Sequence, residues 1–231
     1  MSHIHFVGGE KGGVGKSLLS RLLAQYCIDR SVPFVAFDTD RSHGALLRFY
    51  PQVSTGISID DQEGLDRIVE AAVASPGQRV LVDLAAQTQE PLERWMDGAG
   101  VVDVASEMEL TITLWYVMDA GRDSASLLGA LLDGLGNRMK LVLVKNEVRG
   151  DRFNLLEASG RLARATTAGA QVITLRKLPE STMQKIDALS TSFWAAVHHP
   201  DRSTTGLGLL ERQRVKTWLQ RAYGEIDRIG V

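Results

Sequence analysis

Ten residues near the amino end have the types and the order needed to bind phosphate. Segment 8–17 reads Gly-Gly-Glu-Lys-Gly-Gly-Val-Gly-Lys-Ser and joins a short apolar run to a stretch of helical periodicity. Glycines let successive backbone N–H groups turn inward toward an anion, and the positive end of the helix dipole faces the same point. Lys16 would contact the β- and γ-phosphate oxygens, and Ser17 would give a hydroxyl ligand to Mg²⁺. The segment therefore predicts a loop that binds a phosphate chain.

This loop departs from the generic phosphate-loop pattern G-x-x-x-x-G-K-[ST] at its first position, where Glu10 stands. The remaining residues include a second lysine, Lys11, ahead of Lys16. Lys-Gly-Gly-Val-Gly-Lys-Ser is the deviant Walker A signature, and the chain resembles the ParA/MinD branch of P-loop ATPases. The alternative is a glycine-rich turn that contains a lysine by chance. The position of the motif between a predicted strand and a predicted helix disfavours this alternative.

The resemblance implies ATP or ADP and Mg²⁺ as cofactors. The residues that would bind the phosphates are Gly12, Gly13, Val14, Gly15, Lys16 and Ser17. The resemblance also implies that Lys11 crosses the interface of an ATP-dependent homodimer to the phosphates held by the partner chain. A second ammonium near the γ-phosphate would stabilise the charge of the phosphoryl-transfer transition state, as an arginine finger does. The alternative for Lys11 is a solvated side chain beside an anion site.

Two acidic residues, Asp38 and Asp40, end the second apolar run at what would be the carboxyl edge of a sheet. They resemble the D-x-D switch I motif of the family. By that match Asp40 would position the attacking water and Asp38 would lie near the magnesium shell. The glutamine that usually follows is absent, with Arg41 and Ser42 in its neighbourhood, so the coupling of switch I to a partner stays open. Two solvated acids in a plain turn are the alternative.

Asp83 ends a third apolar run and resembles the Walker B aspartate. A carboxylate there can hold a magnesium-bound water, so the predicted metal site comprises Ser17 with Asp38 and Asp83, the aspartates acting through water. A helix N-cap is the alternative for Asp83. Asp123 looks like the MinD aspartate that can pair with the signature lysine, which makes it a candidate partner for Lys11. A helix cap explains Asp123 equally well.

The predicted base site lies after the last two apolar runs. Asn146 follows the first of these runs, and Leu178 with Pro179 follows the second. These positions resemble the family's adenine contacts, in which an amide reads the base edge and a proline-containing loop covers its face. No aspartate follows Asn146 at the spacing of a guanine-specific N-K-x-D motif, so the sequence favours ATP over GTP.

The elements that must position these residues alternate along the chain. Continuous apolar runs are typical of strands buried on both faces, and they occur at 4–7, 34–37, 80–84, 112–118, 141–144 and 172–175. Segments of helical periodicity separate them. The alternation predicts an α/β fold, a single P-loop NTPase domain over 1–231 with a mostly parallel twisted sheet and helices on both faces. Segment 49–61 is read as irregular, and 199–208 as a loop leading to a C-terminal helix at 209–229.

Composition excludes several classes of protein. The chain has 231 residues, 44% of them hydrophobic, and a formal charge of −2, which excludes global disorder and a histone-like polycation. Cys27 is the single cysteine, so no intrachain disulfide or thiolate metal cluster can form. No signal peptide or long apolar span is apparent. We expect a cytoplasmic protein, with nucleoid association a further hypothesis.

The charges divide unevenly along the chain. Residues 1–137 hold 10 Lys and Arg against 19 Asp and Glu, whereas 138–231 hold 16 against 9. Basic groups spaced along one face would bind duplex DNA non-specifically, as in many ParA-like proteins; a merely solvated basic face is the alternative. The C-terminal helix fits docking onto the sheet better than a membrane anchor, because its apolar stripe contains Trp and Tyr.

The sequence as a whole predicts a Mg-ATP-dependent dimerising ATPase that acts as a positioning or partition-type switch on an unidentified activating or cargo protein. Lys11, Lys16 and Asp40 are its predicted catalytic residues. Relatives with plasmid-stability or conjugal-transfer functions are expected. Two alternatives stay open: a nucleotide-binding regulatory module with little or no hydrolysis, and an ATP-dependent metabolic enzyme. The nitrogenase-reductase branch is excluded, because one cysteine per chain cannot ligate its cluster.

Overall fold

Each predicted apolar run forms a strand of one parallel sheet in the computed structural model, which describes residues 2–40, 44–135, 138–198 and 206–231. The seven strands follow the order β3-β2-β4-β1-β5-β6-β7. Their bounds are β1 (His3–Gly8), β2 (Phe34–Asp38), β3 (Ser54–Gly56), β4 (Arg79–Asp83), β5 (Thr111–Met118), β6 (Lys140–Asn146) and β7 (Gln171–Leu175). The predicted α/β class and parallel topology are confirmed.

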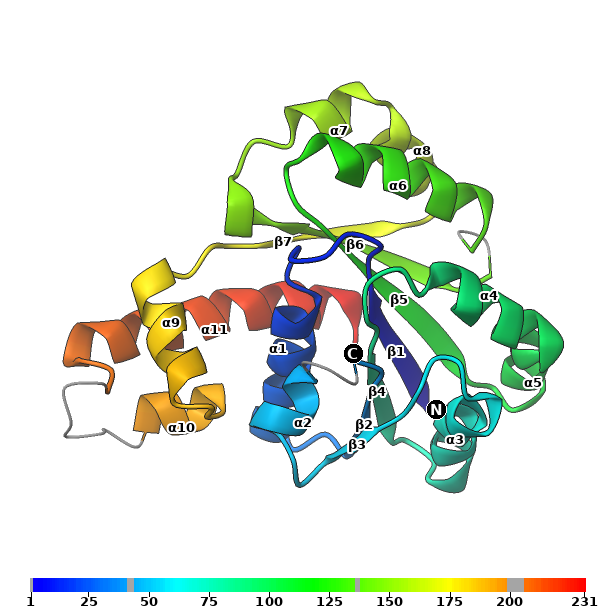
Figure 1. The fold of residues 1–231 in the computed structure, drawn as a ribbon, viewed down its shortest axis with the longest axis horizontal. Coiled ribbons are helices and arrows are strands. Elements are labelled where there is room, and N and C mark those ends of the chain that lie inside the picture. Colours follow the sequence, from blue (N-terminus) through cyan, green and yellow to red (C-terminus); the bar gives the residue numbers. More distant parts are fainter. Residues whose placement is uncertain (1, 41–43, 136–137, 199–205) are drawn as a thin grey trace.

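Helices cover both faces of the sheet (Figure 1). One face packs against α1 (Lys16–Asp29), α2 (Ala45–Phe49), α9 (Glu180–Ala188), α10 (Phe193–His198) and α11 (Leu209–Ile229). The other packs against α3 (Gln62–Ala74), α4 (Gln89–Gly98), α5 (Val101–Glu107), α6 (Arg122–Asp133), α7 (Asn154–Ala158) and α8 (Arg161–Thr167). A short 3₁₀ helix, η1 (Glu147–Arg149), follows β6 directly. Two hydrophobic cores thus sandwich the strands, which explains their continuous apolar sequences.

The sheet's order places the predicted site residues at one edge. β1 lies between β4 and β5, and every described pairing is parallel, so the carboxyl ends of these strands meet. Asp38 at the end of β2 is in register with Asp83 at the end of β4. Ligands of such sheets bind beyond the carboxyl ends of the strands, which is where the glycine-rich loop after β1 lies.

In segment 49–61 the sequence reading of an irregular stretch was wrong at Ser54–Gly56. The segment contains the short edge strand β3, which pairs with β2 alone among the described strands. Three residues are too few to show a periodicity, so the hydrogen bonds to β2 decide the structure. In α11 the predicted apolar stripe is buried. Of the predicted loop 199–208, residues 199–205 lie outside the described residues. Among the described helices, none is long and apolar enough to cross a membrane.

Candidate phosphate-binding site

The glycine-rich loop connects β1 to α1 at the centre of the sheet edge. Gly15 is the N-cap of α1 with φ 98°, a left-handed conformation that favours glycine. Lys16 begins the helix and is buried, and its Nζ donates to the carbonyl oxygen of Lys11 at 3.1 Å. Burial lowers the pKa of Lys16, although nearby acids oppose the shift. The loop thus folds back over its own lysine, ahead of a helix N-terminus that attracts anions.

Asn146 fastens this loop to the end of β6. Its Nδ2 donates to the carbonyl oxygen of Val14 at 2.8 Å, and its Oδ1 accepts from the backbone N–H of Val148 at 3.2 Å. A Cβ placed on Gly15 would lie 2.1 Å from Asn146 Nδ2. Gly15 is therefore required both by its backbone conformation and by the close approach of Asn146.

Asp83 has the environment of a metal-binding carboxylate. Its side chain is 2% exposed, and neither carboxylate oxygen has a hydrogen-bond partner among the described residues. Burial, together with the nearby Asp38, raises the pKa of Asp83 to about 7. Ser20, Ser17 and Lys16 oppose this shift only in part, so a cation or an ordered water network at this point would stabilise the ionised carboxylate further. The donor set of Asp83 and the Ser17 hydroxyl consists of hard oxygens and fits Mg²⁺ with retained waters.

Asp38 makes more contacts than a free metal ligand would. Its Oδ1 accepts from the backbone N–H of Asp40 at 3.0 Å. Its Oδ2 accepts from Leu46 at 2.9 Å and Leu47 at 3.4 Å, in the first turn of α2. Burial nevertheless raises the pKa of Asp38. In this structure Asp38 therefore holds the segment after β2 in place. Sequence reasoning assigned Asp38 only to the magnesium shell.

Asp40 borders a polar cavity of about 630 Å³ beside α3. The same cavity is lined by Asp38, Asp60, Asp61 and Arg67. The neighbouring residues 41 and 42, which replace the usual glutamine, lie outside the described residues. Asp40 therefore sits at the same edge of the sheet as the phosphate loop, as its predicted role in positioning water requires.

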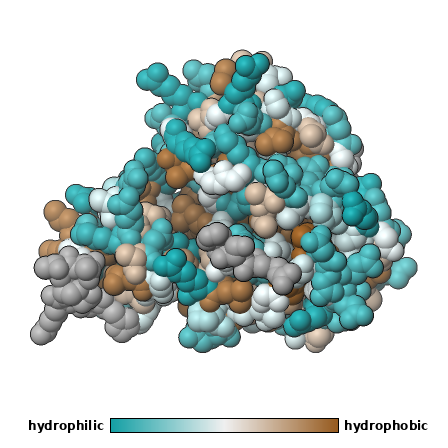
Figure 2. Space-filling view, in the orientation of Figure 1, coloured by the Kyte–Doolittle hydropathy of each residue, from teal (hydrophilic) through white to brown (hydrophobic). Residues whose placement is uncertain are grey.

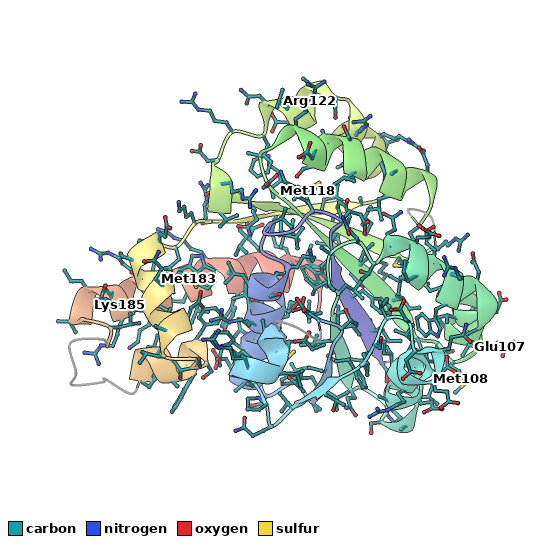
Figure 3. All side chains as sticks on the ribbon, in the orientation of Figure 1. Glu107, Met108, Met118, Arg122, Met183 and Lys185 are labelled. Carbon is teal, nitrogen blue, oxygen red and sulfur yellow. The ribbon has the colours of Figure 1, made fainter. Side chains whose placement is uncertain are left out.

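Lys11 is held by the carboxyl end of β5. Its Nζ lies 3.1 Å from Asp119 Oδ2 and 3.4 Å from Asp123 Oδ2. Asp119 is 1% exposed whereas Asp123 is 72% exposed, so the stronger partner is Asp119. Hydrogen bonds to Asp119 raise the pKa of Lys11. Met118 and Arg122, labelled in Figure 3, stand on either side of the turn that carries Asp119.

Asp119 is itself fixed by its surroundings. Its Oδ1 accepts from the Ser124 hydroxyl at 2.7 Å and from the Gly121 N–H at 3.0 Å. Burial alone would raise the pKa of Asp119, but these hydrogen bonds and Lys11 hold it below its ordinary value. Sequence reasoning missed Asp119, although an acid directly after a buried strand beside β1 was a usable signal.

Arg149 is a second residue that sequence reasoning missed. Its Nη1 lies 3.5 Å from Asp119 Oδ2. A Cβ placed on Gly13 would lie 2.7 Å from Arg149 Nη2, so the guanidinium group contacts the phosphate loop. No periodicity or spacing marks this residue in the sequence, because its position depends on the 3₁₀ turn after β6.

The predicted base residues meet in part. A cavity of about 220 Å³ is lined by Leu18, Asn146, Val148, Arg176, Lys177, Leu178, Glu180 and Met183. Pro179 is the N-cap of α9 next to it. The oxygen and the nitrogen of the Asn146 side-chain amide are each bonded to the backbone, so its contact with a base edge is not pre-formed here. The cavity is apolar on several sides and adjoins the phosphate loop, as an adenine site must.

Glu10, the residue that breaks the generic motif, connects the loop to α4. Its Oε1 accepts from the backbone N–H of Gln89, the first residue of α4, at 3.0 Å. The carboxylate thereby satisfies a free N–H at a helix N-terminus, an arrangement that the helix dipole favours. The departure from glycine thus joins the phosphate loop to the helix that follows Asp83.

No protein-family model matches the chain. Protein MobD of Acidithiobacillus ferrooxidans is 24% identical over 187 residues, 79% of this chain and 81% of that protein. Protein TraL of Escherichia coli is 28% identical over 128 residues, 53% of this chain and 52% of that protein.

Three solved structures share the fold. The MinD cell division protein of Aquifex aeolicus has a TM-score of 0.57 at 14% identity, over 97% of this chain and 98% of that one. The septum site-determining protein MinD of Pyrococcus horikoshii, complexed with Mg-ADP, has 0.53 at 14% identity, over 97% and 98%. A nucleotide-binding protein of Archaeoglobus fulgidus in complex with ADP has 0.51 at 16% identity, over 81% and 86%. With its phosphate loop after β1 and its all-parallel sheet, the chain has a ParA/MinD-like P-loop fold.

Proposed function

We propose that the chain is a Mg-ATP-dependent dimerising ATPase that acts as a positioning or partition-type molecular switch. The observation that carries the proposal is Asp83, a buried carboxylate without a hydrogen-bond partner among the described residues, beside a phosphate loop of the deviant Walker A type. The solved structures with ADP and Mg-ADP support the choice of ligand, since they share the fold. The placement among plasmid-stability or conjugal-transfer relatives stays a prediction.

The chain's residues divide the chemistry among them. The loop N–H groups and Lys16 would bind the β- and γ-phosphates. The Ser17 hydroxyl, and Asp83 through water, would hold Mg²⁺, which would neutralise charge on the phosphate oxygens. Asp40 would orient the attacking water from the end of β2. Asp38 would act on the metal only through water, because its oxygens already hold the backbone around α2.

Dimerisation gives Lys11 its role. In this chain Lys11 is paired with Asp119 and Asp123. Both acids would hold the lysine in the monomer and release it when a second chain presents its phosphates. Sequence reasoning predicted Asp123 as a partner of Lys11, but it did not predict the ion pair with buried Asp119. An ATP-dependent homodimer would then complete each active site with the partner's lysine.

Phosphate release and mass measurements test the proposal together. Wild type should bind Mg-ATP and hydrolyse it, and Lys16→Ala should abolish hydrolysis. Asp40→Ala should still bind ATP but hydrolyse it at least about tenfold more slowly, because the water is no longer positioned. Size-exclusion mass should double with ATP but not with ADP, and Lys11→Ala should remain monomeric.

Other outcomes would favour the rival functions. A wild type that binds nucleotide without releasing phosphate would be the regulatory module. Turnover that requires a small-molecule acceptor would indicate a metabolic enzyme. Absence of any Mg-ATP binding would end the proposal.

We also propose non-specific DNA as a partner, on one specific observation. Arg214, Arg221 and Arg228 are exposed and stand seven residues apart, so they lie along one face of α11. Arg221 and Arg228, with Arg176 of the loop after β7, border a cavity of about 640 Å³. Cations spaced along one face are what phosphate backbones require. Arg228 and Arg176 are themselves paired with Glu225 and Glu147, as Arg164 is with Asp133, so the proposal depends most on Arg214 and Arg221.

A further inference from the structure

Arg149 lies where a ligand of the phosphate loop would meet it. It is the last residue of η1, and its side chain is 52% exposed. A Cβ on Gly13 would be 2.7 Å from its Nη2 and 3.7 Å from its Cζ, so the guanidinium plane approaches the loop backbone. Gly13 has φ +72°, a conformation that favours glycine, and because glycine has no side chain this side of the loop backbone is open. The guanidinium fills that space.

Two attachments fix the position of Arg149 relative to the loop. At the start of η1, Asn146 bonds to the Val14 carbonyl at 2.8 Å and caps the turn through the Val148 N–H. At its end, Arg149 Nη1 lies 3.5 Å from buried Asp119 Oδ2. The turn is thus tied to the loop at one end and to the end of β5 at the other. This geometry presents the guanidinium to the loop before any ligand arrives.

Asp119 is shared by two cations. Lys11 lies 3.1 Å from the same carboxylate oxygen that faces Arg149. Lys11 has a second acid, Asp123 at 3.4 Å, so Asp119 would stay neutralised by Lys11 if Arg149 turned to another anion. Half of the Arg149 side chain stays in solvent, and its ion pair is long. Transfer of the guanidinium from Asp119 to a phosphate would therefore cost little, while a planar fork matches phosphate oxygens well.

We propose that Arg149 contacts the phosphate chain of a nucleotide bound to its own chain, as an arginine supplied in cis beside the lysine supplied by the partner. The inference rests on the proposed nucleotide function and adds a residue to it. The phosphate oxygens would replace Asp119 as the partner of the Arg149 guanidinium. The negative charge that develops on these oxygens during phosphoryl transfer would strengthen the contact. A cap that only supports the loop is the structural alternative.

Affinity and turnover together separate these two roles. Arg149→Ala should lower the affinity for Mg-ATP more than for Mg-ADP and slow single-turnover phosphate release by about tenfold or more. Arg149→Lys, which keeps the charge but not the fork, should recover part of the loss. Arg152→Ala removes an exposed arginine from the following turn and should behave as wild type.

The melting temperature without nucleotide guards against a misfolded variant, and Arg149→Ala should keep it within a few degrees of wild type. Equal losses for ATP and ADP with a lowered melting temperature would overturn the inference in favour of a structural cap, as would unchanged affinity and turnover. If wild type itself bound no nucleotide, the proposed function would fail instead.

Mixed dimers test whether the arginine acts in cis. A mixture of Arg149→Ala with Lys16→Ala chains leaves only the nucleotide site of the Arg149→Ala chain competent, next to a partner that has Arg149. No recovery of hydrolysis is expected, because the partner's arginine faces its own loop. Recovery would show an arginine acting across the interface and would overturn the assignment.

Discussion

A single buried carboxylate, Asp83, makes the stability of the chain depend on pH. Asp83 ends β4 with no hydrogen-bond partner among the described residues, and its pKa is raised from 3.8 to about 7. The folded chain therefore favours the protonated acid and loses stability when the acid ionises. A bound cation would reverse that preference, because it favours the charged form.

Asp83 gives a pH dependence with a definite sign. Without metal or nucleotide, its contribution to the free energy of unfolding should fall as pH rises from about 4 to about 7, because the folded pKa lies above the unfolded one. As pH rises across this range, the free energy of unfolding of Asp83→Asn should increase by about 2–4 kcal/mol relative to that of wild type. Denaturant unfolding of both proteins at several pH values measures the difference.

The comparison with Asp83→Asn is needed because other buried groups act in the opposite direction. The pKa values of His3 and His5 are lowered by burial, to about 4 and about 3. They destabilise the chain at low pH, so the pH profile of wild type alone mixes both effects. A constant difference between the two proteins would contradict the role given to Asp83.

Gly15 should be the least replaceable glycine of the loop. Gly15→Ala places a Cβ 2.1 Å from Asn146 Nδ2 at φ +98°, so backbone strain and a clash add together. A loss of about 1–3 kcal/mol or more is expected in the free energy of unfolding. Gly12→Ala is the control, since a Cβ there meets nothing within 4 Å. Equal stability of the two variants would show that Asn146 does not constrain the loop.

At the scale of elements, α2 is held by hydrogen bonds at both of its ends. Asp38 accepts from its first turn, and Arg48 at its other end donates to the Asp187 carbonyl of α9 at 2.8 Å. Arg21 of α1 lies beneath, 3.5 Å from the ring centre of Phe49 and 2.7 Å from Asp187 Oδ1. The segment after β2 is thus connected to the helix that borders the base cavity.

The Arg21–Asp187 pair should contribute more than the exposed Arg94–Glu90 pair. Arg21 is 6% exposed and Asp187 is 47% exposed, so removal of the acid leaves a buried guanidinium without its charged partner. Asp187→Ala should cost about 1–3 kcal/mol in the free energy of unfolding. Glu90→Ala breaks an exposed pair with Arg94 and should stay within about 0.5 kcal/mol. Chemical denaturation compares them, and equal losses would refute the ranking.

The strands were predictable from the sequence, whereas the short connecting elements were not. Six continuous apolar runs identified strands because parallel strands are buried on both faces. β3 and η1 have three residues each and no pattern of their own. Among site residues, Lys16 and Asp83 follow from motif and strand end. Asp119 and Arg149 depend on side-chain contacts between distant elements, which spacing does not encode.

For the whole molecule, some charges of the acidic half and the basic half of the sequence meet in ion pairs. Basic residues of the second half pair with acids of the first, including Arg138 with Asp97 and Arg149 with Asp119. Within the second half, Lys185 of α9, labelled in Figure 3, pairs with Glu211 of α11. On the face seen in Figure 2, hydrophilic side chains predominate and the hydrophobic ones are scattered. These pairs compensate part of the charge division, and the exposed arginines of α11 belong to the part that faces solvent.

The arginine face of α11 predicts how DNA binding depends on salt. Combined Arg214→Ala and Arg221→Ala should weaken duplex binding and reduce the slope of log affinity against log salt by about 1 for each phosphate that is no longer neutralised. Arg164→Ala, whose arginine is paired with Asp133 on the opposite side of the sheet, is the control. Fluorescence anisotropy at several salt concentrations measures this. An unchanged slope would place any DNA contact elsewhere.

The hydrogen bond from Asn146 to the Val14 carbonyl joins two binding surfaces that a nucleotide would occupy with different parts of itself. Under the proposed function, binding of the base would order the turn after β6 and so lower the free-energy cost of ordering the loop around the phosphates. Binding of the phosphates would lower the cost of ordering the turn by the same amount, because such linkage is reciprocal. The contributions of nucleoside and triphosphate to affinity would then not add. For this chain the two moieties would act as one cooperative ligand, so a fragment of ATP would bind more weakly than its share of the contacts implies.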